Sequence, residues 1–443
     1  MAFRAATVFS QTVVCCLCLF VALAVSQIHH IGSGEEPTNP PCIFTLVESI
    51  PENMTYSAND RRLMSTYDAH MRLLDRANSS IHLASFYWTL RGSDTEVHDY
   101  SSVQGEDIFQ KLSDIVKGGE MDVNIVQNST SNETDELAAS GARVRTINFP
   151  KLLNAGVLHT KMWIVDDQHA YIGSANFDWR SYTQVKEIGI LIENCPTLVK
   201  DAKNIFDIYW YLSNETIPTV PAQLPDDLTP ETTYQSPMPL VYYNETQGRV
   251  ALSSSPPPFC PSGRLQDIDA IIHVIQAANK FIYISVMDYL PLVIYTRPEQ
   301  FWPVIDNELR KAAYERHVSV YLMASKWPHT KVDMYAFLMS LYDLKRAKVH
   351  RIDIQVKLFT VPSTPEQKQI PFARVNHNKF MVTENHAYIG TSNWSGDYFV
   401  NTGGVGFTLE EPDDGVLDGS NVREQLVDVF LRDWNSTYTE YVY

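Results

Sequence analysis

Three features that mark common protein classes are scarce in this 443-residue sequence. Only six residues are cysteine; three lie in one apolar stretch near the N-terminus, and the other three are too widely spaced to form a zinc-ligand pair. Basic side chains number 35 against 52 acidic ones, a formal net charge of −17 that argues against a broad basic surface following a nucleic-acid duplex. A small phosphate site remains compatible with this charge, because local fields can oppose the net charge.

Long apolar runs are scarce as well. Residues 13–25 are thirteen consecutive apolar residues behind Arg4, a run that is short for a membrane span and typical of the core of a secretion signal. Small residues at 24–26 predict cleavage before Gln27, so that 1–26 would be a signal peptide. An uncleaved signal anchor is the alternative. Both predict that the chain after Gln27 lies outside the cytosol.

Glycosylation sequons support this compartment. Asn-x-Ser/Thr occurs eight times, more than chance alone explains behind a signal segment. We predict glycans on Asn53, Asn78, Asn128, Asn132, Asn214, Asn244 and Asn435. The eighth sequon, at Asn393, belongs to the motif described below. A glycan there would block the site, so we predict that Asn393 is unmodified.

The rest of the chain has a globular composition. Hydrophobic residues make up 44% and charged residues 20%, which excludes a disordered or fibrous protein, and the length suits two or three folding units. Residues 80–88 and 281–289 are rich in β-branched and aromatic side chains and predict strands. Predicted helices follow at 105–116 and 303–316. Strands that alternate with helices predict an α/β sandwich.

An internal repeat divides the chain into two similar halves. HTKMWIVDDQHAYIGSANF begins at His159, and HNKFMVTENHAYIGTSNW begins at His377. We expect one half at 42–212 and the other at 265–443. Residues 213–264, rich in Pro, Ser, Thr and Asn, predict a linker or wrapping loop. The two copies of the motif are expected to face each other across a pseudo-two-fold axis.

Each copy of the motif carries the same four kinds of polar side chain. A histidine and a lysine two residues apart share one face of an extended strand, about 7 Å apart. A carboxylate follows the lysine after five residues, and an asparagine follows a second strand that ends in Gly-Ser or Gly-Thr. The candidate catalytic residues are therefore His159, Lys161, Asp166 and Asn176 in the first copy, and His377, Lys379, Glu384 and Asn393 in the second.

Together the two copies match the needs of a phosphodiester. Lysine and asparagine side chains can bind the nonbridging oxygens and stabilise the charge of the transition state. One imidazole can attack phosphorus, while the other protonates the leaving oxygen and later activates water. These groups cover nucleophile, acid and positive charge, so we expect no metal and no cofactor. One H-x-K sequence would mean little; two complete copies favour catalysis over coincidence, and a decayed, inactive duplication is the alternative.

Glu187 distinguishes the two copies. It lies 28 residues after His159 and could hydrogen-bond the far nitrogen of that imidazole, whereas the second copy has Gly403-Gly404 in the corresponding region. A histidine with an orienting carboxylate is the better nucleophile. We therefore predict His159 as the nucleophile and His377 as the acid. An ordinary surface glutamate is the alternative interpretation of Glu187.

The motif resembles the signature of the phospholipase D superfamily, H-x-K-x4-D followed by Gly-Ser/Thr and Asn. The first copy fits it in full, whereas the second has Glu384 where Asp is usual. Other segments, among them SFYWTL, SSSPPPFCPSGR, VMDYLP and HNKFMVTE, resemble the lysosomal 5′-exonuclease branch of this superfamily from about Cys42 to Trp434. That branch typically carries the glutamate as well.

The resemblance implies a fold, a reaction and a cellular setting. A single strand of DNA or RNA with a free 5′-hydroxyl would be cut at its first phosphodiester, and the terminal nucleotide would be held as a 3′-phosphohistidine until water releases a nucleoside 3′-monophosphate. The resemblance further implies a lysosomal homodimer with a Cys42–Cys195 disulfide and a free Cys260. Phospholipid hydrolysis or transphosphatidylation is the second hypothesis, and a catalytically silent, membrane-associated binding protein is the third.

Aromatic residues end the first predicted strand of each half. Phe86, Tyr87 and Trp88 do so in the first half, and Tyr289 in the second. Because every base has a flat face, stacking on such rings would suit an exonuclease without sequence preference. The alternative is that they belong to the core or to an interface.

An acidic compartment raises a question about protonation. Free imidazole has a pKa of about 6.5, so a nucleophilic histidine would be largely protonated at about pH 5. The motif lysines would lower this pKa and Glu187 would raise it, and the sequence does not decide which influence prevails.

Overall fold

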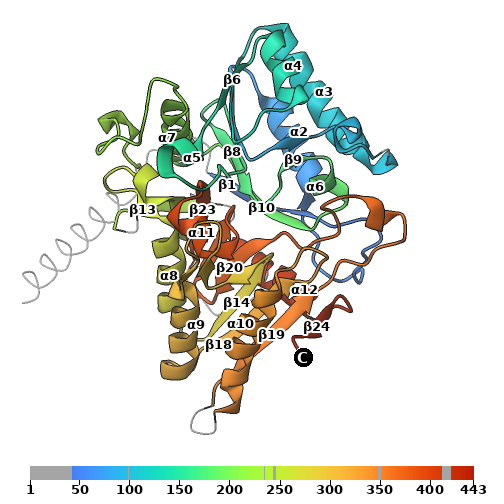
Figure 1. Cartoon of the computed structure of the whole chain (residues 1–443), viewed down its shortest axis with the longest axis vertical. Helices are drawn as coiled ribbons and strands as arrows, with labels where there is room; N and C mark the ends of the chain where they lie inside the picture. The colour runs from blue at the N-terminus through green and yellow to red at the C-terminus, as the bar shows by residue number, and fades with distance from the viewer. Residues whose placement is uncertain (1–41, 98, 234, 243–245, 348–350, 412–420) are drawn as a thin grey trace, which may run out of the picture. The chain divides into compact units, whose positions relative to one another are not determined.

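The computed structural model describes residues 42–97, 99–233, 235–242, 246–347, 351–411 and 421–443 (Figure 1). The predicted signal segment 1–26 and the sequon at Asn244 lie outside these residues. Within the described ranges, no helix combines the length and the apolar character needed to cross a bilayer.

An eight-stranded sheet forms the basis of the first half, in the order β2-β1-β10-β8-β7-β3-β5-β6. Strands β3, β5 and β6 are parallel neighbours, whereas β7, β8, β10 and β1 add to the sheet in antiparallel fashion. The strands are β1 Ile43–Ser49, β2 Met64–Ser65, β3 Ser80–Ser85, β5 Asp122–Gln127, β6 Arg143–Thr146, β7 Met162–Val165, β8 His169–Gly173 and β10 Glu187–Glu193.

The second half repeats this sheet strand for strand. Its order, β11-β12-β23-β21-β20-β14-β18-β19-β24 with β13 paired to β12, contains the counterparts of β1-β10-β8-β7-β3-β5-β6 in the same sequence. The strands are β11 Met238–Tyr242, β12 Thr246–Ser255, β13 Leu265–Gln266, β14 Phe281–Val286, β18 Ser319–Ser325, β19 Ile354–Phe359, β20 Lys379–Thr383, β21 His386–Gly390, β23 Gly404–Glu410 and β24 Thr439–Tyr441. This equivalence confirms the predicted α/β fold of two similar halves.

Helices cover the outer face of each sheet. Buried residues of α2 (Thr66–Arg76), α3 (Val103–Gly118) and α4 (Asn132–Ser140) form one apolar core with the first sheet. Helices α8 (Asp267–Ala277), α9 (Val304–Glu315) and α10 (Val332–Asp343) form another with the second sheet and lie along β14, β18 and β19 in Figure 1. A third core joins the facing sides of both sheets with α7 (Pro196–Leu212) and α12 (Val422–Trp434). The two copies of the motif therefore lie in sheets that are covered on both faces.

Short elements connect these layers. The remaining α-helices and strands are α5 Phe149–Leu153, α6 Arg180–Thr183, α11 Gly396–Val400, β4 Trp88–Thr89, β9 Phe177–Asp178, β15 Tyr289–Leu290, β16 Leu292–Val293, β17 Gln300–Phe301 and β22 Trp394–Ser395. The 3-10 helices are η1 Gly92–Thr95, η2 Tyr100–Ser102, η3 Asp226–Leu228, η4 Pro257–Phe259, η5 Leu344–Arg346 and η6 Gln367–Gln369.

Part of the predicted linker at 213–264 belongs to the second sheet. Strand β12 pairs with β23 from Arg249 to Ser255 and supplies the neighbour that β1 supplies to β10 in the first half. The three prolines that follow this strand, at 256–258, gave the segment the composition of a loop. The second sheet therefore begins before residue 265, the predicted boundary.

Most of the predicted glycosylation sites lie at the surface. Asn53, Asn78, Asn132, Asn214 and Asn435 are exposed, and Asn128 is half-buried. Asn393 is only 2% exposed in the folded chain. An oligosaccharide has no room at this position, which supports the prediction that Asn393 is unmodified; the other sequons stay predictions.

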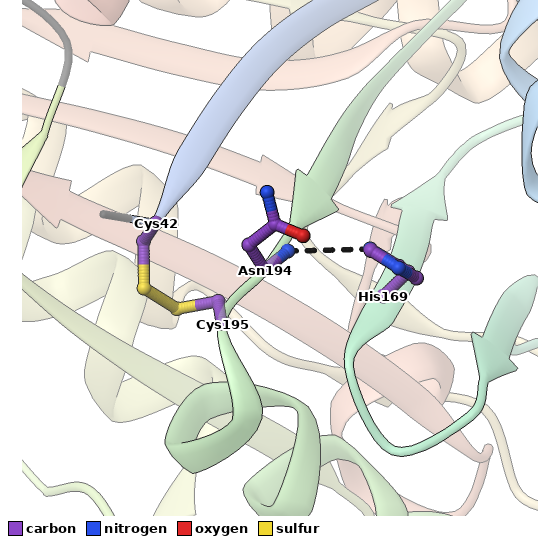
Figure 2. Close-up of a disulfide and its surroundings, with 4 residues drawn as sticks. All are labelled: Cys42, His169, Asn194 and Cys195. Carbon is purple, nitrogen blue, oxygen red and sulfur yellow. Dashed lines mark hydrogen bonds between the residues drawn. A yellow bond between two sulfur atoms is a disulfide. The ribbon is translucent and has the colours of Figure 1, made fainter. Parts of the chain in front are cut away.

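The Cys42–Cys195 disulfide is present in the structure. It joins the residue before β1 to the residue before α7, as Figure 2 shows, and closes a loop with a sequence separation of 153 residues. Close by, the backbone N–H of Asn194 donates to Nδ1 of His169 at 3.2 Å. The disulfide therefore fixes one end of the first sheet. The predicted pairing is confirmed.

Removing this disulfide should destabilise the chain. We expect the double substitution Cys42→Ser and Cys195→Ser to lower the free energy of unfolding by about 3–5 kcal/mol, because the closed loop restricts the unfolded chain. Urea unfolding followed by intrinsic fluorescence would measure the change. Cys260→Ser is the control, since Cys260 forms no disulfide. A double variant no less stable than this control would contradict the expectation.

Candidate active site

Two short backbone pairings join the halves beside the motifs. The residue before each motif histidine pairs with the opposite half: Leu158 with Gly403, and Asn376 with Lys186. The histidine that follows donates its backbone N–H to the carbonyl of the same partner residue, at 2.8 Å in both cases. Equivalent segments thus contact each other reciprocally, as a two-fold relation between the halves requires.

A cavity of about 500 Å³ lies at this junction. Five candidate catalytic residues from the two halves line it: His159, Asn176, Glu187, His377 and Asn393. Aromatic side chains form much of the remaining wall, namely Phe86, Tyr87, Tyr295, Trp327, Phe372 and Tyr398. One cavity therefore holds both predicted histidines and both predicted asparagines.

The motif lysines are buried directly beside the histidines. Nζ of Lys161 donates to the carbonyl of His159 at 2.5 Å, and Nζ of Lys379 donates to the carbonyl of His377 at 2.5 Å. Both lysines are fully buried. Burial lowers the pKa of Lys161 well below its usual value and that of Lys379 to about 7. An anionic phosphate beside them would favour their charged forms.

His159 is held in one neutral tautomer. Its Nδ1 lies 2.9 Å from the backbone carbonyl of Thr391, and because a carbonyl only accepts, Nδ1 carries the proton and Nε2 keeps its lone pair. Burial lowers the pKa of His159 well below 6.5, and the charges of Lys161 and Lys379 lower it further. This imidazole is therefore suited to remain neutral in an acidic solution.

His377 has a carboxylate as its partner. Its Nδ1 lies 2.9 and 3.1 Å from the two oxygens of Glu187, which also accept hydrogen bonds from the hydroxyls of Ser174 and Ser181. Burial raises the pKa of Glu187 to about 7 and lowers that of His377, since neither charge is solvated. Below about pH 7 the carboxyl group of Glu187 is therefore protonated and donates to Nδ1, so that the ring proton of neutral His377 lies on Nε2, from which it can be donated.

The prediction that Glu187 orients His159 is wrong: Glu187 contacts the histidine of the other half. The strand pairing brings residue 404, the counterpart of Glu187, to the side of His159, and this residue is glycine. A Cβ atom on Gly404 would lie 2.2 Å from Oγ of Ser392, so no larger side chain fits. The carbonyl of Thr391 takes the place of a carboxylate.

Each motif asparagine is paired with a tyrosine. Nδ2 of Asn176 donates to the hydroxyl of Tyr87 at 3.2 Å, and Nδ2 of Asn393 donates to that of Tyr398 at 3.0 Å. The Oδ1 atoms of both amides are buried without a hydrogen-bond partner among the described residues. Rotating the Asn393 amide by half a turn would let Tyr398 donate to Oδ1 and would leave an N–H donor for a ligand. Tyr87 already donates its proton to Asp178 at 2.8 Å, so Asn176 keeps its orientation and can offer a ligand only the second N–H of Nδ2.

The motif carboxylates Asp166 and Glu384 do not line the cavity, which corrects their assignment to the catalytic set. They follow β7 and β20 at the ends away from the histidines, about 20 Å along the strand by its rise per residue. Asp166 accepts hydrogen bonds from the backbone of Ser79 and Ser80, and Glu384 from that of Asn279. Both fix the start of the neighbouring strand.

The four predicted base-stacking residues divide into two groups. Phe86 and Tyr87 line the cavity, and the ring of Phe86 lies 5.1 Å from that of His159. Trp88 and Tyr289 are each 2% exposed and belong to the core, which corrects their assignment to the substrate site. They lie in the short strands β4 and β15. Trp88 donates to Ser85, and Tyr289 donates to Asp306.

Sequence reasoning missed four aromatic residues of the cavity wall: Tyr295, Trp327, Phe372 and Tyr398. The ring of Tyr398 meets that of His159 edge-on, with centroids 4.9 Å apart. Its position five residues after the motif asparagine could have marked it, because the preceding short strand returns the chain to the cavity. The other three lie in loops that the repeat does not mark.

Comparisons with known proteins identify the family. A family model described as "PLD3/4, PLD-like domain" matches residues 57–364. The chain is 47% identical over 406 residues to the 5′-3′ exonuclease PLD3 of Xenopus tropicalis, covering 90% of this chain and 80% of that protein. It is 43% identical over 420 residues to the human 5′-3′ exonuclease PLD3 (93% and 84% covered), and 41% identical over 413 residues to the mouse 5′-3′ exonuclease PLD4 (92% and 81%).

A solved structure shares the fold. The phosphatidylserine synthase of Haemophilus influenzae superposes with a TM-score of 0.56 at 12% identity and covers 85% of each chain. At this identity the likeness concerns the fold alone. The family model and the sequence relatives together place the chain in the phospholipase D superfamily, within its PLD3/4 branch.

Proposed function

We propose that this chain is a 5′-to-3′ exonuclease that removes nucleotides from single-stranded DNA and RNA as nucleoside 3′-monophosphates. One observation carries the proposal: two histidines from the two halves line one cavity, but only one of them is paired with a carboxylate. A two-step displacement at phosphorus needs this difference between its two imidazoles. The names of the relatives supply the reaction type.

In the first step His159 is the nucleophile. Its neutral Nε2 attacks the phosphorus of the first phosphodiester, and a P–N bond forms while the bond from phosphorus to the 5′-oxygen of the second nucleotide breaks. That oxygen takes the proton from Nε2 of His377, while the carboxyl proton of Glu187 passes to Nδ1, so the imidazole stays neutral and Nε2 is left with a lone pair. The products are a 3′-phosphohistidine and a strand that is one nucleotide shorter.

In the second step the same pair works as a base. Having lost its proton, the pair has a free Nε2 on His377, which removes a proton from water as the water oxygen attacks phosphorus. The P–N bond breaks, His159 returns to its neutral form, and the nucleoside 3′-monophosphate leaves. The pair regains the proton that it gave up in the first step, so the cycle is balanced.

Positive charge and amide donors surround the phosphorus in this proposal. Lys161 and Lys379 place two ammonium groups beside the histidines, and the amide N–H groups of Asn176 and Asn393 can donate to nonbridging oxygens. A local excess of positive charge thus forms in a chain whose net charge is −17. The same groups neutralise the transition state without a divalent cation.

The setting proposed for this reaction is the lysosomal lumen, with a homodimer as the working form. The disulfide supports an oxidising compartment, and five exposed sequons support passage through the secretory pathway. A phospholipid remains the alternative substrate predicted from the sequence, and the experiment below includes it. A silent binding protein is less consistent with two complete motifs in one cavity.

Product analysis tests the proposal directly. Purified protein at about pH 5 in excess EDTA should shorten a 3′-labelled, 5′-hydroxyl single strand one nucleotide at a time and release 3′-monophosphates, since histidines and lysines supply the chemistry. Chromatography against 3′- and 5′-monophosphate standards distinguishes the products. Phosphatidylglycerol vesicles, assayed in parallel, should be turned over more slowly.

A preparation carrying His159→Ala, purified in the same way, controls for contaminating nucleases. Release of 5′-monophosphates, or loss of activity in EDTA that Mg²⁺ restores, would contradict the proposed reaction. Faster turnover of the vesicles than of the oligonucleotide would favour the phospholipid alternative.

A further inference from the structure

A second cavity adjoins the catalytic one. Its volume is about 390 Å³, and it shares Trp327 and Phe372 with the catalytic cavity. These two rings therefore stand between the histidines and the second cavity. His329 and Lys368 line only the second cavity.

Phe372 is an exposed aromatic ring in a costly backbone conformation. Its side chain is 62% exposed, and its φ angle is +54°, a region that bulky residues rarely adopt. The imidazole of His329 stacks on it with a centroid distance of 4.9 Å and an interplanar angle of 21°. Trp327 in turn packs edge-on against His329 at 4.7 Å. The result is a cluster of three aromatic rings, Trp327–His329–Phe372, called the platform below: His329 covers one face of Phe372, and the side chain of Phe372 remains largely exposed.

Buried arginines hold this platform in place. The guanidinium of Arg180, from the first half, donates to the carbonyl of Pro371, the residue before the platform ring. Arg374 donates to the carbonyl of Pro362 at 3.0 Å and to the side chain of Gln184 at 3.0 Å. The segment that carries the exposed ring is thus fixed on both sides of Phe372. A ring held in place loses little conformational freedom when a ligand binds, which favours binding at this position.

The chain that carries the platform leads directly to the proposed acid. Four residues lie between Phe372 and His377, and one of them, Val375, lines the catalytic cavity. In the proposed mechanism His377 protonates the 5′-oxygen of the second nucleotide, so the leaving strand starts on the side of His377. The base of that second nucleotide would then lie next to the platform, while the exposed Lys368 carries a positive charge toward the following phosphate.

We propose that the Trp327–His329–Phe372 platform binds the first base of the leaving strand by stacking. The inference rests on the proposed exonuclease function and adds to it a site for a nucleobase outside the catalytic cavity. Stacking accepts any base, whereas a phospholipid headgroup has no flat ring to stack. The platform thus selects single-stranded nucleic acid as the substrate class.

The test compares two trinucleotides that differ only at the second position. One carries a normal base there, and the other an abasic residue with the same sugar and phosphates. The unmodified protein should cleave the first bond of the normal substrate with a kcat/KM about tenfold higher than that of the abasic one. Phe372→Asn should remove this preference, because asparagine accepts the positive φ angle but offers no ring. Phe372→Trp should keep it.

Phe301→Ala is the matched control. Phe301 is 67% exposed and stacks on Phe337, but it lines neither cavity, so its removal should leave the preference intact. A Phe372→Asn variant that still prefers the normal base, or an unmodified protein without any preference, would overturn the inference while leaving the proposed function untouched. Failure of the unmodified protein to cleave either trinucleotide would instead overturn the proposed function, and the platform proposal with it.

Discussion

Replacing His159 with alanine will abolish turnover of every phosphodiester substrate, whereas His377→Ala will spare one half-reaction. We expect both variants to lose about 10⁴-fold or more in kcat/KM on an oligonucleotide. A nucleoside 3′-(p-nitrophenyl phosphate) separates them, because p-nitrophenolate leaves without a proton. His377→Ala should release one equivalent of p-nitrophenolate per site and then stall, since no base remains to activate water. Stopped-flow absorbance would record this burst.

The stalled variant should also carry the covalent intermediate. With a ³²P-labelled oligonucleotide of activated leaving group, acid-labile and base-stable label should remain on the His377→Ala protein and be absent from the His159→Ala protein. His169→Ala is a control, since His169 lies on β8 and bonds to Asn194 outside the cavity. A burst from His159→Ala and none from His377→Ala would reverse the two assignments.

The sequence predicted the two histidines and two asparagines of the cavity because the motif is local and occurs twice. His159 and His377 each lie within twenty residues of the asparagine that shares the cavity with them, and the strand that joins them is fixed by short-range pairing. Because the two halves contain equivalent strands in the same order, they form two similar sheets. For such residues, spacing along the chain is enough to predict proximity.

Glu187 shows where this reasoning fails. The sequence identified Glu187 as the carboxylate that orients a histidine but assigned it to His159, the histidine of its own copy. In the structure Glu187 instead contacts His377, because the two halves pair with each other at this point. The absence of an acid at Gly404 was visible in the sequence. What it could not show is that residue 404 lies beside His159, because this depends on pairing between segments far apart in the chain.

The predictions about the aromatic residues were wrong for a different reason. Alternation predicts which side of a long strand a residue faces, but the strands that carry Trp88 and Tyr289 are two residues long, and the preceding strands end three residues earlier. The chain bends there, so that Tyr87 faces the cavity while Trp88 enters the core. Loop residues such as Phe372 have no periodic signal at all, and only the folded chain reveals them.

The pH dependence of the reaction should depend on Glu187. In the unmodified protein we expect kcat/KM to fall about tenfold per pH unit above about pH 7, because the Glu187–His377 pair then loses the proton that the leaving oxygen needs. On the acidic side, activity should fall only well below pH 6.5, where the buried His159 becomes protonated. The low pKa of His159 and the raised pKa of Glu187 together would allow the proposed reaction to run in acidic solution.

Glu187→Gln should move the alkaline limb of this profile to lower pH. A neutral amide cannot hold the proton, and burial beside Lys379 leaves His377 alone with a pKa below its usual value. The loss in kcat/KM should therefore be about 100-fold at pH 7 and smaller at pH 5. Ser181→Ala is the matched comparison, since it removes a hydrogen bond that lowers the pKa of Glu187, and it should move the same limb to higher pH. Because the two variants act in opposite directions, a general disturbance of the cavity cannot imitate the result. An alkaline limb that stays in place in both variants would show that the acidic proton is held elsewhere.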